Sequence, residues 1–324
     1  MKDYGLYGEI PYVNKKVSRI VFGTAIEPML YGKDCDELLD AALANGINAF
    51  DTARNYAGAE ASLGKWLERR SNRKEIVIVS KCAHPDENGS RVNEKAIRED
   101  FARSSEYLRT EYIDIYLLHR DDRTVSAGKV VEILNALHAE GKIGAFGGSN
   151  WSHRRIAEAN EYAYKHNLIP FTLSSPNYGL AHQIQDPWGG GCVTLSGIEN
   201  EAAREWYRKT EMSVIAYSSL GRGFFSGRIK SGEPDRAKEI LDGAAVKAYD
   251  CEENYERLRR CEILARKKSV TVAQIAMRWI FEQGLNAYAV VSANHGNRIK
   301  ENVAALSIPM TAEEGDYLDL KKEL

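Results

Sequence analysis

Short apolar runs alternate with longer stretches of helical periodicity along most of this chain. Runs such as 76–79 (IVIV) and 113–118 (IDIYLL) are apolar at successive positions, which is typical of parallel strands covered on both faces. Stretches such as 271–283 (TVAQIAMRWIFEQ) place their apolar residues on one helical face. The pattern predicts eight strands, at residues 19–22, 48–50, 75–79, 113–118, 143–147, 171–173, 214–216 and 287–291.

Residues at the ends of the helical stretches support this assignment. Asn93 opens the stretch 93–109 and is a suitable N-cap. Gly46, Gly141 and Gly284 each follow a helical stretch, where a left-handed residue commonly ends the helix. Strands that alternate with helices fit either a closed barrel or an open, doubly wound sheet.

The polar ends of the predicted strands favour the barrel. In barrels of this class the active site lies at the C-terminal rim and draws on several strands, whereas an open sheet concentrates such residues at one switch point. The dinucleotide fingerprint G-x-G-x-x-G is also missing after the first strand. We therefore expect one domain over residues 1–324, an α/β protein with the (β/α)8 TIM-barrel fold. The strand-end positions are Gly23-Thr24, Asp51, Lys81, His119, Ser149, Ser175, Ser218 and Ser292.

Composition and charge exclude several classes of partner. The formal net charge is −2, so we expect neither nucleic acid nor an anionic membrane to bind. The stretch 1–16 is charged, unlike a signal peptide, and the longest apolar runs are too short to span a bilayer. The odd number of cysteines, without metal-ligand spacing, indicates reduced thiols in a cytoplasmic protein without a bound metal. These cysteines are Cys35, Cys82, Cys192, Cys251 and Cys261.

Four residues at the predicted rim suit one chemistry together. Asp51, Lys81 and His119 end three strands, and Tyr56 lies in the loop after the first of them. Taken alone, an Asp, Lys or His at a strand end is usually a solvated loop residue, and a Tyr is more often a surface or core residue than a catalyst. Barrel closure, however, would bring these strand ends to one rim.

Carbonyl reduction by hydride leaves an alkoxide that needs a proton. A tyrosine hydroxyl can supply it, although its unperturbed pKa is ~10. A neighbouring Lys81 ammonium would stabilise the Tyr56 phenolate and lower that pKa, and Asp51 would hold Lys81 charged. His119 would hydrogen-bond the substrate carbonyl and orient it. A nicotinamide cofactor would supply the hydride.

The chain resembles the aldo-keto reductase superfamily over essentially its whole length. The order and spacing of the matching segments carry the resemblance, which implies that Tyr56 is the proton donor, Lys81 its pKa partner, Asp51 the residue that pairs with the lysine, and His119 the residue that orients the carbonyl. The matching segments are FGTA at 22–25, FDTARNY at 50–56 with Glu60 and Leu63-Gly64 beyond it, VSK at 79–81, DIYLLH at 114–119, FGGSN at 146–150, AYSSLGRG at 216–223 and RIKEN at 298–302.

The resemblance also implies contacts with a nicotinamide dinucleotide. Ser149 and Asn150 match the pair that bonds the nicotinamide carboxamide, and Ser175 stands where a glutamine commonly contacts it. Tyr217 matches an aromatic residue that stacks on the nicotinamide ring, although a strand core residue is the alternative. Further matches near the ribose and pyrophosphate, or near the strand ends that face them, are Gly23, Thr24, Asp51, Ser218 and Leu220.

The choice between NADP and NAD depends on the adenosine end. Arg298 and Asn302 match residues that hold it, and a guanidinium there suits a 2′-phosphate. The segment before Arg298, SANHGN, has Ser292 where a lysine can stand. This leaves fewer positive charges, so we expect NADP and keep NAD as the alternative. Another departure is Ala57, which stands where a glycine usually follows the tyrosine.

Substrate contacts are the least specified part of the site. The insert 182–197 (HQIQDPWGGGCVTLSG) follows the sixth strand and should emerge on the catalytic face. We expect Trp188 or Tyr178 to face the substrate and Trp151 to line its pocket, together with Tyr56 and His119. A structural connection anchored by Trp188 is the alternative.

The sequence thus predicts an NADP-dependent reductase of a small aldehyde or ketone, with sugar-like carbonyl compounds among the candidates. One alternative is a cofactor-binding regulatory subunit on the same fold with little turnover. A metal-dependent hydrolase barrel is a second alternative, but it requires His and carboxylate ligands at several strand ends. Only His119 and Asp51 stand at such positions.

Overall fold

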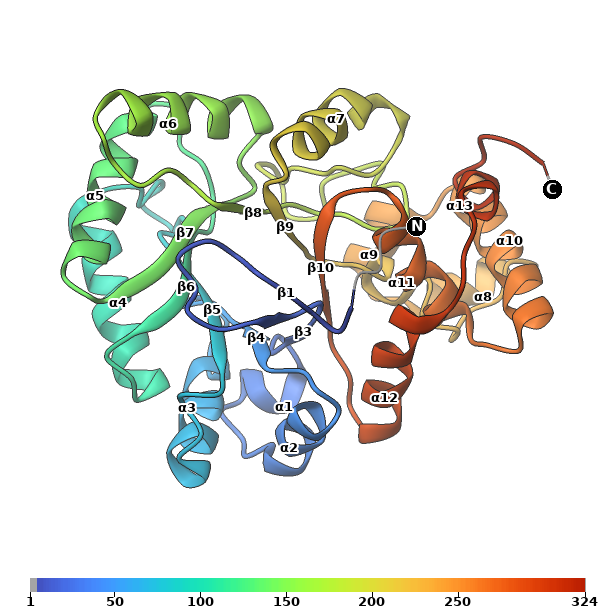
Figure 1. The fold of residues 1–324 in the computed structure, drawn as a ribbon. Helices are drawn as coiled ribbons and strands as arrows, with labels where there is room; N and C mark the ends of the chain where they lie inside the picture. Colours follow the sequence, from blue (N-terminus) through green and yellow to red (C-terminus); the bar gives the residue numbers. More distant parts are fainter. Residues whose placement is uncertain (1–4, 324) are drawn as a thin grey trace. The chain divides into compact units, whose positions relative to one another are not determined.

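Eight parallel strands close into a barrel in the computed structural model, which describes residues 5–323. The strand order is β10-β3-β4-β5-β6-β7-β8-β9. This confirms the predicted (β/α)8 barrel (Figure 1). The first four residues of the stretch 1–16 lie outside the described residues.

The chain divides into two compact units. The N-terminal unit comprises Leu6–Ser175 and Ser292–Ile299, and the C-terminal unit comprises Pro176–Val291 and the residues from Lys300 onward. That residues 1–324 form one domain remains a prediction.

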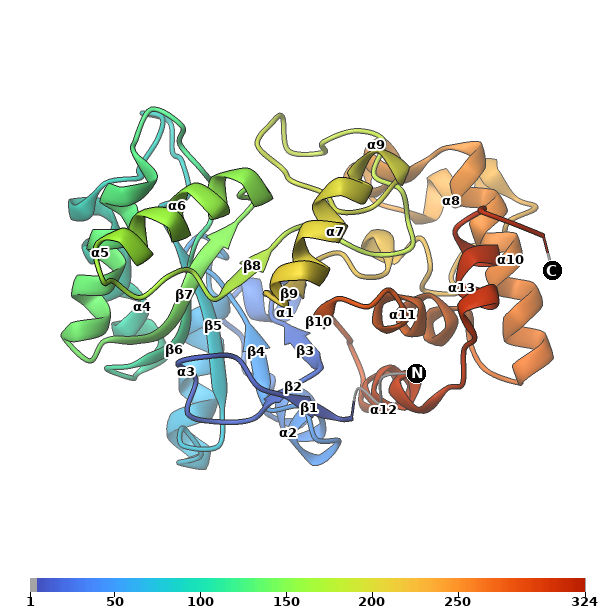
Figure 2. The ribbon, with the colours of Figure 1, turned by 45° about the horizontal axis from the view of Figure 1, so that its top comes forward.

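The N-terminal unit contains six of the barrel strands in chain order. A short antiparallel pair, β1 and β2, precedes them. Helices α4, α5 and α6 lie along one side of β5 to β7 (Figures 1 and 2). The elements are β1 (Tyr7–Gly8), β2 (Val17–Ser18), β3 (Ile20–Gly23), α1 (Glu27–Leu30), α2 (Asp36–Ala44), β4 (Ala49–Asp51), α3 (Ala59–Arg70), β5 (Val77–Cys82), α4 (Glu94–Leu108), β6 (Ile113–Leu118), α5 (Ala127–Ala139), β7 (Ile143–Ser149), α6 (His153–Lys165) and β8 (Leu173–Ser175).

The C-terminal unit contains the parallel pair β9 and β10 and most of the remaining helices. Helices α10, α11 and α13 pack against one another there (Figure 2). Helix α12 begins in the N-terminal unit and ends in the C-terminal unit. The elements are η1 (Ile198–Asn200), α7 (Glu201–Thr210), β9 (Ser213–Ala216), η2 (Gly221–Gly223), α8 (Pro234–Ile240), α9 (Gly243–Tyr249), α10 (Glu252–Lys268), α11 (Val272–Glu282), β10 (Asn286–Val291), α12 (Gly296–Ala304), η3 (Ala305–Ser307) and α13 (Ala312–Leu318).

The predicted helix ends are confirmed. The Asn93 side chain accepts a hydrogen bond of 3.0 Å from the Ala96 N–H and caps α4. Gly46, Gly141 and Gly284 have φ angles of 84°, 71° and 73°, the left-handed conformation that ends a helix without steric cost. These local signals place the helices, and therefore the strand ends that follow them.

Candidate active site

Asp51 and Lys81 form a buried ion pair at the ends of the neighbouring strands β4 and β5. The Lys81 Nζ donates to Asp51 Oδ2 at 2.6 Å and to the Thr52 carbonyl at 2.9 Å. Only 3% of the lysine side chain and 6% of the aspartate side chain are exposed. Burial would lower the pKa of Lys81, but Asp51 and then Tyr56 raise it above its ordinary value. The lysine therefore stays charged beside the tyrosine.

Tyr56 lies in the loop between β4 and α3, next to this ion pair. Lys81 Nζ is 5.2 Å from the centre of the tyrosine ring. Burial raises the pKa of the Tyr56 hydroxyl above its ordinary value, and the Lys81 charge offsets only part of that rise. The predicted direction of the lysine effect is therefore present, but desolvation outweighs it. Tyr56 is consequently protonated at neutral pH and able to donate a proton.

The loop that carries Tyr56 is held by a tight turn. The Tyr56 N–H donates to the Ala53 carbonyl at 3.0 Å, and the Ala59 N–H donates to the Tyr56 carbonyl at 2.9 Å. Ala57 adopts a φ of 41° between them. This left-handed conformation explains in physical terms why a glycine suits the position after the tyrosine.

His119 follows β6 and lies beside Tyr56. The two ring centres are 5.7 Å apart, with an angle of 76° between the planes. The imidazole is 6% exposed, and its Nδ1 has no hydrogen-bond partner among residues 5–323. Burial, followed by the charge of Lys81, holds the pKa of His119 well below its ordinary value. The imidazole is therefore neutral and can donate a hydrogen bond to a carbonyl oxygen without carrying a charge.

The sequence interpretation missed His84, which lies against His119. Their ring centres are 4.9 Å apart at 84°. His84 Nδ1 lies 2.8 Å from the Pro85 carbonyl, which can only accept, so Nδ1 carries the proton. Burial lowers the pKa of His84 as well. The only signal in the sequence was its position three residues after Lys81.

Arg120, the residue after His119, was also missed. It is half-buried, and its Nη1 donates to the His119 carbonyl at 3.3 Å. Two further hydrogen bonds hold this backbone: Asn150 Nδ2 to the His119 carbonyl and Trp151 Nε1 to the Arg120 carbonyl, each 3.3 Å. The segment that carries the histidine and the arginine is thus fixed from β7 and the residues that follow it.

A buried carboxylate supports the catalytic loop from below. Glu60, in the first turn of α3, is fully buried; its Oε1 accepts from Ser80 Oγ at 2.7 Å, and its Oε2 pairs with Arg54 Nη1. The Arg54 N–H in turn donates to the Lys81 carbonyl at 3.0 Å. Glu60 therefore connects Ser80, the residue before Lys81, with Arg54, two residues before Tyr56.

The predicted nicotinamide contacts of the N-terminal unit cluster at the ends of β7 and β8. Ser149 Oγ donates to the Ser175 carbonyl at 2.9 Å, and Asn150 Nδ2 donates to Ser149 Oγ at 3.2 Å. Asn150 adopts a left-handed φ of 59° that turns its side chain back to this group. Ser175 Oγ is buried and has no hydrogen-bond partner in the described part of the chain. A ligand amide would satisfy it.

Gly23 and Thr24 lie at the end of β3. The Thr24 N–H and hydroxyl both donate to the Asp51 carbonyl, each at 2.9 Å. The Ser292 hydroxyl donates to the Gly23 carbonyl at 2.9 Å. The first strand is thereby tied to Asp51 on one side and to the segment before α12 on the other.

The other predicted cofactor residues belong to the C-terminal unit, except Arg298. Tyr217, Ser218 and Leu220 follow β9 and are half-buried. The turn continues through η2, where the Gly221 N–H donates to the Ser218 carbonyl at 2.7 Å. Arg298 and Asn302 are four residues apart on α12, so they lie on the same side of that helix. Arg298 is half-buried and Asn302 is 3% exposed.

The predicted substrate residues lie in different environments. Trp151 is fully buried and packs on Phe171, with ring centres 5.2 Å apart. Tyr178 is fully buried beside Trp279, and its hydroxyl has no hydrogen-bond partner among the described side chains and backbone. Trp188 is 52% exposed and stacks with the Arg222 guanidinium at 4.8 Å. Of the three, only Trp188 presents its ring to solvent.

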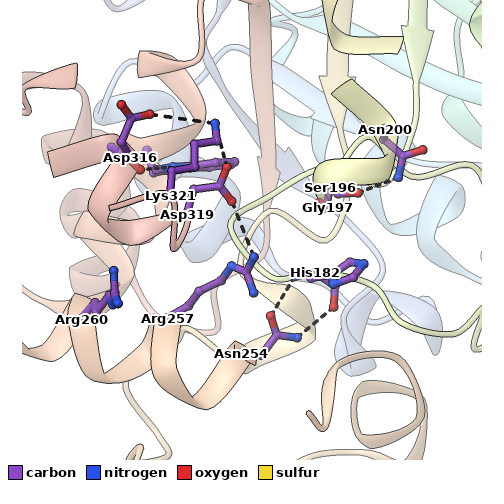
Figure 3. Close-up of polar contacts among 12 residues, drawn as sticks. His182, Ser196, Gly197, Asn200, Asn254, Arg257, Arg260, Asp316, Asp319 and Lys321 are labelled. Atoms are coloured by element: carbon purple, nitrogen blue, oxygen red, sulfur yellow. Dashed lines mark hydrogen bonds and ion pairs between the residues drawn. The ribbon is translucent and has the colours of Figure 1, made fainter. Parts of the chain in front are cut away.

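Both ends of the insert 182–197 are anchored within the C-terminal unit (Figure 3). His182 and Asn254 exchange hydrogen bonds of 2.9 and 2.8 Å, and Asn200 Nδ2 donates to the Ser196 carbonyl at 2.7 Å. The three glycines at 189–191, which adopt positive φ angles, lie between these anchors. The insert is therefore a closed loop whose tip carries Trp188.

The described residues contain neither a candidate metal site nor a candidate membrane-spanning helix. Within residues 5–323, no group of three or more His, Cys, Asp or Glu side chains is arranged to hold a metal ion. None of the helices in the same range is long and apolar enough to cross a membrane.

Known proteins that resemble this chain share one family. The model of the aldo/keto reductase family matches residues 19–323. An aldo-keto reductase of Strobilurus tenacellus is 27% identical over 86% of this chain and 78% of its own length. A putative aryl-alcohol dehydrogenase of Schizosaccharomyces pombe is 28% identical over 97% and 95%. A norsolorinic acid reductase of Aspergillus flavus is 25% identical over 88% and 72%. The chain therefore belongs to the aldo/keto reductase family of oxidoreductases.

Proposed function

We propose that this protein is an NADPH-dependent reductase of small aldehydes or ketones, with Tyr56 as the proton donor. The observation that carries the proposal is the arrangement at the ends of β4, β5 and β6. A protonated Tyr56 lies beside the buried Lys81–Asp51 ion pair and the neutral imidazole of His119. An acid held protonated next to a fixed cation, with a neutral hydrogen-bond donor beside it, suits the reduction of a carbonyl group.

Each side chain has a separate task in this proposal. His119 donates a hydrogen bond to the carbonyl oxygen and orients it toward Tyr56. The Tyr56 hydroxyl transfers its proton to that oxygen as negative charge develops there. Lys81 stabilises the phenolate that results, and Asp51 keeps Lys81 charged and in place. General acid catalysis of this kind contributes roughly 10²–10⁴-fold to the rate.

The residues at the ends of β7 and β8 fit a nicotinamide carboxamide. Ser175 Oγ is buried without a partner among the described residues, and Ser149 and Asn150 adjoin it. A buried hydroxyl without a partner is costly, and a bound amide would relieve this cost. When bound, the cofactor supplies the hydride. By the family resemblance, Tyr217, Ser218, Leu220, Gly23 and Thr24 serve the rest of the nicotinamide nucleotide.

Arg298 and Asn302 on α12 would hold the adenosine end, and Arg298 favours the 2′-phosphate of NADP. NAD is the alternative cofactor.

The names of two relatives guide the choice of substrate: one is named for an aryl alcohol and the other for norsolorinic acid. They favour an aromatic carbonyl compound as the first substrate to test. The test combines fluorescence titration with NADPH and NADH and the loss of NADPH absorbance with a panel of aryl and aliphatic aldehydes. We expect tighter binding of NADPH and turnover of at least one aldehyde. Tighter binding of NADH would overturn the cofactor preference. Binding without any turnover would favour a regulatory subunit on the same fold, and no binding would contradict the proposed enzyme.

A further inference from the structure

Arg120 carries a positive charge on the segment that presents His119. It is the residue after His119, and its Nη1 donates to the His119 carbonyl at 3.3 Å. Burial is the main cause of the lowered pKa of His119 and of His84, and the Arg120 charge contributes to both. Burial raises the pKa of Tyr56, and the Arg120 charge opposes part of that rise. The guanidinium therefore lies beside the backbone of the residue proposed to orient the carbonyl.

No carboxylate neutralises this guanidinium. Among residues 5–323, Arg120 forms no ion pair within 4.0 Å. The adjacent carboxylate of Asp121 pairs with Arg155 at 3.2 Å, and the Asp51 carboxylate of the site pairs with Lys81 at 2.6 Å. Arg120 is therefore a charge without an ion-pair partner in the described part of the chain.

Arg120 is also placed to reach a ligand. Its side chain is half-buried rather than enclosed, while its backbone carbonyl is held by the Trp151 indole at 3.3 Å. His84, which lies against His119, uses its Nδ1 proton for the Pro85 carbonyl and keeps Nε2 as an acceptor. A fixed backbone with a guanidinium of this kind suits a carboxylate or phosphate oxygen, which it can bind with two parallel hydrogen bonds.

From this arrangement we propose that Arg120 selects carbonyl substrates that carry an anionic group, a carboxylate or a phosphate. The inference rests on the proposed reductase function. It assigns the substrate class by charge: the aldehyde or ketone binds with its carbonyl oxygen toward Tyr56 and His119, and its anionic group pairs with Arg120.

The experiment compares two aldehydes that differ only in charge, 4-formylbenzoate and its methyl ester, together with an aldehyde that carries a phosphate. The readout is the ratio of kcat/KM for the anion to kcat/KM for the ester. We expect the wild-type ratio to exceed ten and to fall as salt is added, because ions screen the attraction. Arg120→Met should lower the ratio at least tenfold, and Arg120→Lys should restore part of it. Arg123→Met, which removes an exposed arginine three residues further on, should leave the ratio unchanged.

The outcomes separate this inference from the proposed function. If the wild type reduces neither aldehyde, the proposed function fails. If it reduces both with a ratio near one that salt does not change, the inference is wrong and the function stands. A drop of equal size for both substrates in Arg120→Met would also contradict the inference, since it would mean that Arg120 only supports the fold or the developing alkoxide. The relative values for carboxylate and phosphate identify the preferred anion. The wild-type ratio and its salt dependence decide the matter even if the Met variant does not fold.

Discussion

Substitution of Glu60 by glutamine should destabilise the protein strongly. The carboxylate is fully buried, accepts from Ser80 Oγ at 2.7 Å and pairs with Arg54, whose guanidinium also lies 4.5 Å from the centre of the Tyr107 ring. Glutamine keeps an acceptor for Ser80 but leaves the arginine without its counter-ion. Removing one partner of a buried ion pair costs about 3–5 kcal/mol. Because 18% of the Arg54 side chain is exposed and can be hydrated, we expect the lower value, about 3 kcal/mol.

The matched control lies on the same helix. Glu68 pairs with Arg109, but these side chains are 61% and 41% exposed. Exposed pairs of this kind contribute at most about 1 kcal/mol, so Glu68→Gln should change the free energy of unfolding by less than that. Urea denaturation with parallel slopes measures both variants. If Glu60→Gln and Glu68→Gln differ by less than about 1 kcal/mol, the assignment of Glu60 as the support of the catalytic loop is refuted.

Three further predictions concern the site and the packing beneath it. The kcat of carbonyl reduction should stay level between about pH 7 and 9, because burial keeps the pKa of Tyr56 above its ordinary value. A fall in kcat with a midpoint below pH 9, absent in a Tyr56 variant, would contradict this. Trp188→Ala should raise KM or alter the aldehyde preference with cofactor affinity unchanged, whereas an effect on thermal stability alone would make the insert a structural connection. Gly64→Ala should lower the free energy of unfolding, measured by urea denaturation, by about 1–3 kcal/mol, because the added Cβ would lie 2.0 Å from the Tyr107 carbonyl oxygen. Gly243→Ala is the control, because its added Cβ would have no atom within 4 Å.

The strands could be predicted because a strand that is buried on both faces has an uninterrupted run of apolar residues in the sequence. The strand predicted at 113–118 matches β6 at both ends. The sixth strand was predicted two residues early, at 171–173, whereas β8 is Leu173–Ser175. The two serines that end it are fully buried, so polar side chains inside the barrel were taken for the end of the strand. The short helices α8 and α9 and the pair β1–β2 carry too few residues to show a period.

Residue type and position at a strand end predicted part of the candidate site, but not the residues whose placement depends on the folded loops. The contact between Asp51 and Lys81 followed from strand ends that adjoin in a barrel. His84 was missed because its approach to His119 depends on loop conformation, including the left-handed φ of 55° at Ala83. Arg120 was missed because nothing in the sequence separates it from a solvated loop arginine. Trp151 was expected in the pocket, but its indole packs where a Cβ on Gly148 would lie, 2.4 Å from Trp151 Cγ. The space that the indole fills next to Gly148 exists only in the folded backbone and has no counterpart in the sequence pattern.

The measurement that tests the central claim most directly is the rate of hydride transfer in a single turnover of the Tyr56→Phe variant. The loss of NADPH absorbance reports this rate, and the substrate is an aldehyde that the wild type reduces. The phenylalanine keeps the ring beside His119 but cannot donate a proton, while the proposed cofactor contacts lie on other residues. We predict that the rate constant for NADPH oxidation falls by about 10²-fold or more and that NADPH affinity by fluorescence titration stays within about threefold. A variant that oxidises NADPH in a single turnover at close to the wild-type rate would contradict the assignment of Tyr56 as the proton donor.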